Sequence, residues 1–130
     1  MVIIVRINVV QELAKGWKDD PDTLPFLQQR AQSDDHGSVR SAAVEELTKG
    51  WYGRLEIFDF LANCVVKEPF VRSKNKLLAQ VETDPRQTAL IGIVEYFPDH
   101  PQTKDLLSDR SQNDPDEQVR KFAQQALESL

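Results

Sequence analysis

The sequence predicts an all-α fold, namely a right-handed α-solenoid of about four stacked helical pairs. One observation is a constant offset that relates Val5-Arg6 to Val39-Arg40 and Gly16-Trp17 to Gly50-Trp51. A second is a longer offset that is shared by seven positions, and constant offsets of this kind are typical of stacked helical units. The seven positions are Pro21, Thr23, Leu27, Arg30, Asp34, Val39 and Arg40, which return as Pro101, Thr103, Leu107, Arg110, Asp114, Val119 and Arg120.

The first unit covers residues 2–34 and begins with a segment, 2–17, that fits either a strand or a helix. Apolar and polar residues alternate from Val5 to Val9, but apolar residues also recur at helical spacing. The counterpart at 39–50 has high helix propensity, so we expect a helix in both places. The helical stripe of the first segment comprises Ile3, Ile7, Val10, Ala14 and Trp17.

The later units follow the same pattern with one interruption. Lys74, Asn75 and Lys76 stand where the first two units have small or apolar residues, so the period breaks there. We expect seven helices, and the sequence leaves open whether residues 72–82 form an eighth. The remaining boundaries are a second unit at 35–68, an irregular insert at 69–84, a third unit at 85–114 and a capping helix at 115–130, all within one domain of residues 1–130.

Three Asp-Pro pairs predict helix starts. An aspartate at the N-cap accepts a hydrogen bond from the first turn, and proline suits the first helical position because its missing N–H would be unpaired there anyway. We therefore expect helices to begin at Asp20-Pro21, Asp84-Pro85 and Asp114-Pro115.

The two ends of the predicted stack differ. The first helix carries Ile3, Ile4 and Ile7 among several valines, so its first turns are apolar around nearly the whole circumference and require cover on both sides. The last helix has one apolar stripe and a polar outer face, as a terminal capping helix does. We expect a preceding repeat, a protein partner or a second copy of this chain, giving a homodimer, to cover the three isoleucines.

Composition narrows the class of partner. The 130 residues include 16 basic and 21 acidic ones, a net charge of −5, which disfavours nucleic acid as a partner. Cys64 is the only cysteine, so an internal disulfide is excluded. No apolar stretch approaches the ~20 residues that span a membrane, and the first residues do not resemble a signal peptide. We expect a cytoplasmic protein that binds another protein and needs no cofactor.

Two short stretches are candidates for contact with that partner. Trp51, Tyr52 and Arg54 lie where the second unit lacks the Asp-Pro turn, and they combine residue types that are enriched at interface hot spots. The insert contributes the only basic cluster, and departures from a repeat often carry binding. This cluster consists of Arg72, Lys74 and Lys76.

Repeated residues also have a structural explanation. Trp17 and Trp51 occupy the same phase of a repeated stripe, which favours packing between helices. Four arginines follow a valine, and Asp34 and Asp114 precede two of them, which predicts charge-assisted bonds between successive units. These arginines are Arg6, Arg40, Arg72 and Arg120. We expect no catalytic, cofactor-binding or metal-binding residue, since no motif for such chemistry is present.

Residues 39–47, Val-Arg-Ser-Ala-Ala-Val-Glu-Glu-Leu, resemble the opening helix of HEAT repeats, particularly the phycobilisome-lyase-type HEAT-like repeats. Four further segments resemble the C-terminal HEAT region of cyanobacterial NACHT-domain proteins. They are Gly-Trp-Lys-Asp-Asp-Pro-Asp-Thr-Leu at 16–24, Asp-Pro-Arg-Gln-Thr-Ala-Leu at 84–90, Pro-Asp-His-Pro-Gln-Thr at 98–103 and Asn-Asp-Pro-Asp-Glu-Gln-Val-Arg at 113–120.

The resemblance implies a non-catalytic protein–protein interaction or scaffolding module, the sensor or regulatory part of a NACHT-type signalling NTPase system. It implies no nucleotide hydrolysis, because the chain lacks Gly-x-x-x-x-Gly-Lys-Ser/Thr. The name of the lyase-type repeats suggests an alternative function, that of a bilin lyase component that acts on phycobiliproteins. A DNA-binding HEAT protein of the alkylation-repair type would need a basic groove, which the net charge disfavours.

Overall fold

The computed structural model describes residues 2–130, and every regular element within that range is a helix. The expected all-α class is therefore confirmed, and the ambiguous first segment is helical. The insert contains one short helix, which answers the question left open at 72–82. The elements are α1 (Ile3–Gly16), α2 (Thr23–Ser33), α3 (Gly37–Trp51), α4 (Leu55–Lys67), α5 (Lys76–Val81), α6 (Pro85–Tyr96), α7 (Thr103–Asn113) and α8 (Glu117–Ser129).

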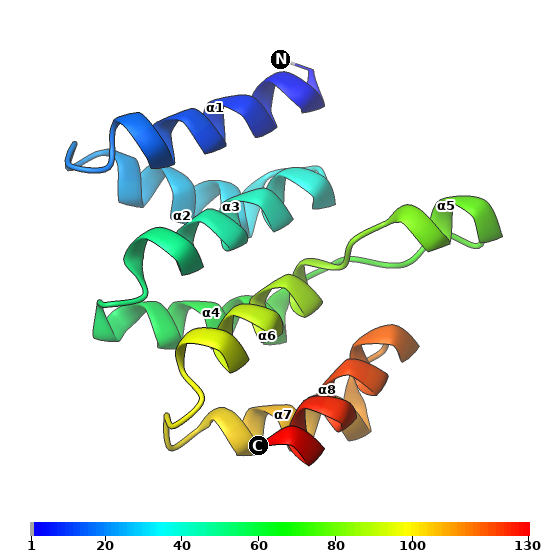
Figure 1. Cartoon of the computed structure of the whole chain (residues 1–130). Helices are drawn as coiled ribbons and strands as arrows, with labels where there is room; N and C mark the ends of the chain where they lie inside the picture. The colour runs from blue at the N-terminus through cyan, green and yellow to red at the C-terminus, as the bar shows by residue number, and fades with distance from the viewer. Residues whose placement is uncertain (1) are drawn as a thin grey trace.

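Seven helices pack in two layers, and α5 lies apart from them (Figure 1). Helices α1, α3, α6 and α8 lie side by side in that order, each in contact with the next. Helices α2, α4 and α7 form the second layer, and they pack mainly on α3, α6 and α8, respectively. Each contacts the helix before it in the chain far less. The tightly packed pairs are thus α2 with α3, α4 with α6, and α7 with α8. The predicted units at 2–34, 35–68 and 85–114 instead paired α1 with α2, α3 with α4, and α6 with α7.

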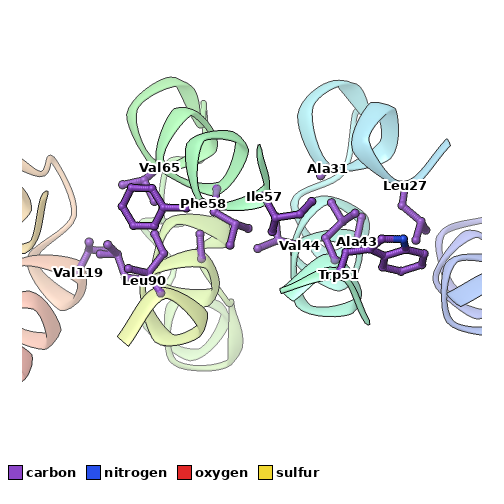
Figure 2. Close-up of a cluster of buried hydrophobic side chains, with 14 of the residues drawn as sticks. Leu27, Ala31, Ala43, Val44, Trp51, Ile57, Phe58, Val65, Leu90 and Val119 are labelled. Carbon is purple, nitrogen blue, oxygen red and sulfur yellow. The ribbon is translucent and has the colours of Figure 1, made fainter. Parts of the chain in front are cut away.

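A continuous apolar core lies between the two layers (Figure 2). All seven packed helices contribute to it, and the stripes expected from helical spacing supply most of its members. Burial of such side chains is the main favourable term in folding, at about 1.5–3 kcal/mol for each large aliphatic or aromatic group. The largest fully buried side chains are Phe58, Leu27, Leu47, Ile57, Leu61, Leu90, Ile93 and Leu107.

Trp17 and Leu55 are large apolar residues that are exposed, and Trp17 was expected to pack between helices. Trp17 is 60% exposed, whereas its counterpart Trp51 is 4% exposed. The difference arises because Trp51 belongs to α3, which has α1 and α6 on either side, whereas Trp17 follows α1, which has only α3 beside it. Leu55, the first residue of α4, is 91% exposed, because no neighbouring helix covers the start of α4.

Only one Asp-Pro pair begins a helix as predicted. Asp84 is the N-cap of α6 and accepts a hydrogen bond from the Arg86 backbone N–H at 2.9 Å. The prediction is wrong for Asp114-Pro115, because α8 begins at Glu117 and Asp114 instead ends α7. It is also wrong at Asp20-Pro21, where the chain forms a turn and α2 begins at Thr23.

The expected charge-assisted bonds between helices are present. Arg40 of α3 holds Glu68, at the end of α4, through two hydrogen bonds of 2.8 and 2.9 Å. Its third bond, of 2.8 Å, reaches the backbone carbonyl of Asp34. Arg120 donates in the same way to the carbonyl of Asp114 at 2.6 Å. The two halves of the chain therefore share not only residues but also the bonds that those residues make.

We expect Arg40→Met to destabilise the protein by about 3–5 kcal/mol, because it leaves the Glu68 carboxylate buried without a cation. Both side chains are less than a tenth exposed, at 8% and 4%. Chemical denaturation at neutral pH measures the change. The matched control is Lys49→Met, since Lys49 pairs with Glu45 on the surface, and we expect a loss below about 1 kcal/mol there. Equal losses in the two variants would contradict the structural role of the Arg40 pair.

A glycine permits the close approach of α3 and α6. A Cβ atom on Gly92 of α6 would meet Thr48 Cγ2 and lie 2.8 Å from Thr48 Oγ1. Thr48 is buried, and its hydroxyl donates to the Val44 carbonyl at 2.8 Å, so it has little room to move. Gly92 is therefore required by packing between these two central helices of the first layer.

We expect Gly92→Ala to lower the free energy of unfolding by about 1–2 kcal/mol, because overpacking outweighs the gain in helix propensity. The same change in a Thr48→Ala background should restore most of that loss. At Gly50, where a Cβ atom would lie 3.8 Å from the flexible end of Lys18, alanine should instead stabilise by up to about 1 kcal/mol. Urea denaturation of the four variants tests this, and a stabilising Gly92→Ala would show that the helices can separate freely.

Candidate protein-interaction surfaces

The start of α1 presents the first candidate surface, which we call the N-terminal patch and define as residues 2–5. Its four side chains, Val2, Ile3, Ile4 and Val5, are 64%, 38%, 68% and 40% exposed. Ile7 is partly buried and packs against the core. At the other end of the layer, the outer face of α8 is polar, with Lys121, Gln124, Gln125 and Glu128 exposed. The predicted difference between the two ends is present in the structure.

The structure separates the three candidates around the α3–α4 turn. Trp51 is buried, so its side chain is not available to a partner. Tyr52 is about half exposed, and its ring stacks on that of Tyr96 with centroids 4.6 Å apart. Arg54 is exposed and lies 3.8 Å from Glu56. Of these three candidates, only Tyr52 and Arg54 are accessible to a partner.

The insert forms a projection beyond the two layers, which we call the arm and define as residues 71–81 (Figure 1). Arg72 anchors it, donating to both carboxylate oxygens of Asp116, at the start of α8, at 3.0 and 2.9 Å. The same guanidinium also donates to the backbone carbonyls of Ala79 and Glu82 at 2.8 and 3.0 Å. Arg72, a candidate for partner contact, thus serves to hold the arm in place.

The tip of the arm carries both predicted and unpredicted residues. Lys74 and Lys76 are exposed, as a partner contact would require. The sequence analysis did not single out four aliphatic residues beside them. Their spacing gives little signal, because α5 has only six residues and cannot show a helical stripe. These residues are Val71, Leu77, Leu78 and Val81, which are 84%, 76%, 54% and 77% exposed.

A cavity of about 260 Å³ lies between α1 and α2, lined by Arg6, Val9, Phe26 and Arg30. Arg6 Nη1 donates to Asp34 Oδ1 at 3.1 Å, as expected for the repeated arginines, and to an oxygen of Asp35 at 2.7 Å. Arg30 Nη1 donates to the other oxygen of Asp34 at 3.2 Å. The cavity therefore combines two guanidinium groups with apolar walls, which the sequence alone did not indicate.

The remaining chemistry-bearing side chains have structural partners. Cys64 is buried, and this burial raises the pKa of its thiol to about 12, so it stays protonated at neutral pH. His36 and His100 each accept a backbone hydrogen bond in a turn, and the His100 ring stacks on Phe58. Among residues 2–130, no three histidine, cysteine or acidic side chains are grouped closely enough to hold a metal ion.

Comparison with known proteins adds no relative. No protein-family model matches the chain, and neither a curated protein nor a solved structure gives a significant match. Within the part of the chain that the structure describes, no helix has both the length and the apolar character needed to cross a membrane. The surfaces described above are therefore the basis for inferring a function.

The bond between Arg72 and Asp116 makes stability depend on pH. Hydrogen bonding to Arg72 holds the pKa of the Asp116 carboxyl below its ordinary value, so the pair stabilises the fold above the unfolded-state pKa of about 3.9. This contribution is lost as the pH falls through the lower, folded-state pKa. We expect Arg72→Met to cost about 2–3 kcal/mol near neutral pH, and less in acid.

NMR titration of Asp116 combined with denaturation at several pH values measures both effects. In the Arg72→Met variant, the pKa of Asp116 should rise. Lys121→Met is a suitable control, because Lys121 pairs with Glu117 on the same helix but both side chains are exposed. A destabilisation by Arg72→Met that is independent of pH would mean that lost packing, rather than the ion pair, explains it.

Proposed function

We propose that this chain is a right-handed α-solenoid of HEAT-like helical pairs and acts as a non-catalytic protein–protein interaction or scaffolding module. The observation that carries the proposal is the N-terminal patch. Exposed clusters of aliphatic side chains are costly in water and mark surfaces that another molecule covers. Ile4, at 68% exposure, is the most exposed side chain of this patch.

The position of the patch supports a protein partner. Helix α1 lies at one end of the first layer, with α3 on one side. A partner helix or segment on the other side would extend the layer and bury the patch, as neighbouring units do in helical arrays. The resemblance to HEAT regions of NACHT-domain proteins suggests a regulatory role for such a contact, in which the partner is a component of a signalling NTPase system.

Affinity capture from a cell extract tests the proposal. The purified chain and its Ile3→Ser/Ile4→Ser variant serve as baits, and mass spectrometry identifies the proteins retained. We expect a protein that the unmodified chain retains and the variant loses, because removing two apolar contacts from the centre of an interface weakens binding by about 10- to 100-fold.

Leu55→Ser is the matched control, because Leu55 is a still more exposed aliphatic residue on α4. Exposed substitutions of this kind should change stability by only about 0.5 kcal/mol, which a thermal melt verifies. Retention of the same proteins by all three baits would contradict the role of the N-terminal patch. Retention that only Leu55→Ser abolishes would point to α4 instead.

A further inference from the structure

Two pairs of arginines occupy equivalent positions in the N-terminal and C-terminal halves of the chain. Arg30 of α2 donates from Nη1 to Asp34 at 3.2 Å, and Arg110 of α7 donates from Nη1 to Asp114 at 3.3 Å. Arg6 of α1 also binds Asp34, at 3.1 Å, and its counterpart in α6, Arg86, lies 3.8 Å from Asp114. The two halves can therefore be compared residue by residue at this site, although Arg6 faces Asp34 through Nη1 and Arg86 faces Asp114 through Nε.

In the C-terminal half, the edge of each guanidinium that is formed by Nε and Nη2 binds a carboxylate. Arg86 donates from Nε and Nη2 to Asp84 Oδ2 at 3.1 and 2.8 Å. Arg110 donates from the same two atoms to Asp109 Oδ2 at 3.0 and 2.7 Å. Hydrogen bonds between ionised groups, as in these two pairs, are stronger than those between neutral groups.

In the N-terminal half, the same edge of Arg6 and Arg30 donates to no residue that the structure describes. The two Nε atoms are buried as well, and a buried donor without an acceptor is costly. The reason is visible in the sequence, because Ile4 and Gln29 stand at the positions that correspond to Asp84 and Asp109 in the other half. The N-terminal half thus lacks both carboxylates.

Arg120 shows that this arrangement is specific to the α1–α2 cavity. Its only hydrogen bond to a described residue also uses Nη1. Its Nε, however, is not among the buried atoms that lack a partner, so water can satisfy it. Arg6 and Arg30, by contrast, have buried Nε atoms and line the cavity of about 260 Å³, which has room for an acceptor group.

We propose that the α1–α2 cavity binds a carboxylate side chain from an acidic segment of a protein partner. The carboxylate accepts from the Nε–Nη2 edge of Arg6, as Asp84 does from Arg86, and apolar residues beside it cover Ile4 and Val5. This inference rests on the proposed function and adds the chemistry of the partner. An extended peptide fits better than a small anion, because Arg86 also donates to the backbone carbonyl of Phe70 at 2.9 Å, and because the N-terminal patch adjoins the site.

Substitution of Ile4 tests the site without any partner. Ile4→Asp places a carboxylate two residues before Arg6, at the sequence position that corresponds to Asp84 but inside α1 rather than at its N-cap. Ile4→Asn has the same shape without the charge. We expect the aspartate variant to have a folding equilibrium constant about tenfold larger than the asparagine variant near neutral pH. The advantage should disappear at pH below the carboxyl pKa. No advantage at neutral pH would overturn the proposal.

Two controls isolate the Arg6 edge. An Arg6→Lys background keeps a cation beside Asp34 but removes the pair of donors on one edge. In that background, the difference in folding equilibrium constant between the aspartate and asparagine variants should shrink to the effect of charge attraction alone. Val5→Asp and Val5→Asn measure the effect of a charge in the first turn of α1, where the helix dipole also favours it. An equally large difference at Val5 would overturn the assignment to Arg6.

A peptide probe tests recognition between molecules. The probe has the sequence of residues 78–86 of this chain, and its control carries Asp84→Asn. In NMR titrations, the probe should shift the Nε–H signals of Arg6 and Arg30, and the control should not. Equal shifts, or none, would overturn the proposal. Because neither measurement needs a natural partner, failure here is distinguishable from failure of the capture experiment, which tests the N-terminal patch.

Discussion

Two buried carboxylates, Asp34 and Asp114, hold the helix ends in register, and each joins three helices. Asp34 accepts from Arg6 of α1 and Arg30 of α2 through its side chain, and from Arg40 of α3 through its carbonyl. Asp114 joins α6, α7 and α8 with the equivalent arginines. A buried charge is costly unless it is fully paired, so these bonds specify one arrangement of helices that the non-directional apolar core alone would not.

Within the described residues, the middle of the chain has no aspartate that joins three helices in this way, and the arm follows α4 instead. Glu68, at the end of α4, accepts hydrogen bonds from Nε and Nη2 of Arg40. The chain then leaves the two layers and returns to them at Asp84. The arm is nevertheless tied to the body, because Arg72 binds the N-cap residue of α8, Asp116. It therefore presents its aliphatic tip from an ordered base, which reduces the entropy that a partner would have to overcome on binding.

The internal comparison connects the fold to the proposed function. In the C-terminal half, Asp84 and Asp109 accept hydrogen bonds from the two arginines. The N-terminal half has Ile4 and Gln29 at the corresponding positions. Ile4 supplies no acceptor for the Nε–Nη2 edge of Arg6, and it is itself an exposed aliphatic side chain. Both features lie at the start of α1, which is where a partner would extend the first layer.

The sequence by itself determined the helical class, the apolar stripes and the repeated arginine–aspartate bonds, because these depend on local spacing and on offsets that can be read along the chain. Only the tertiary structure decided the exposure of Trp17 and the burial of Trp51, since the two differ in the number of neighbouring helices. It also decided that Asp114 ends a helix, because its carboxylate is engaged by arginines from elsewhere in the chain. The cavity beside Arg6 depends on α1 and α2 together, so no pattern within either helix could reveal it.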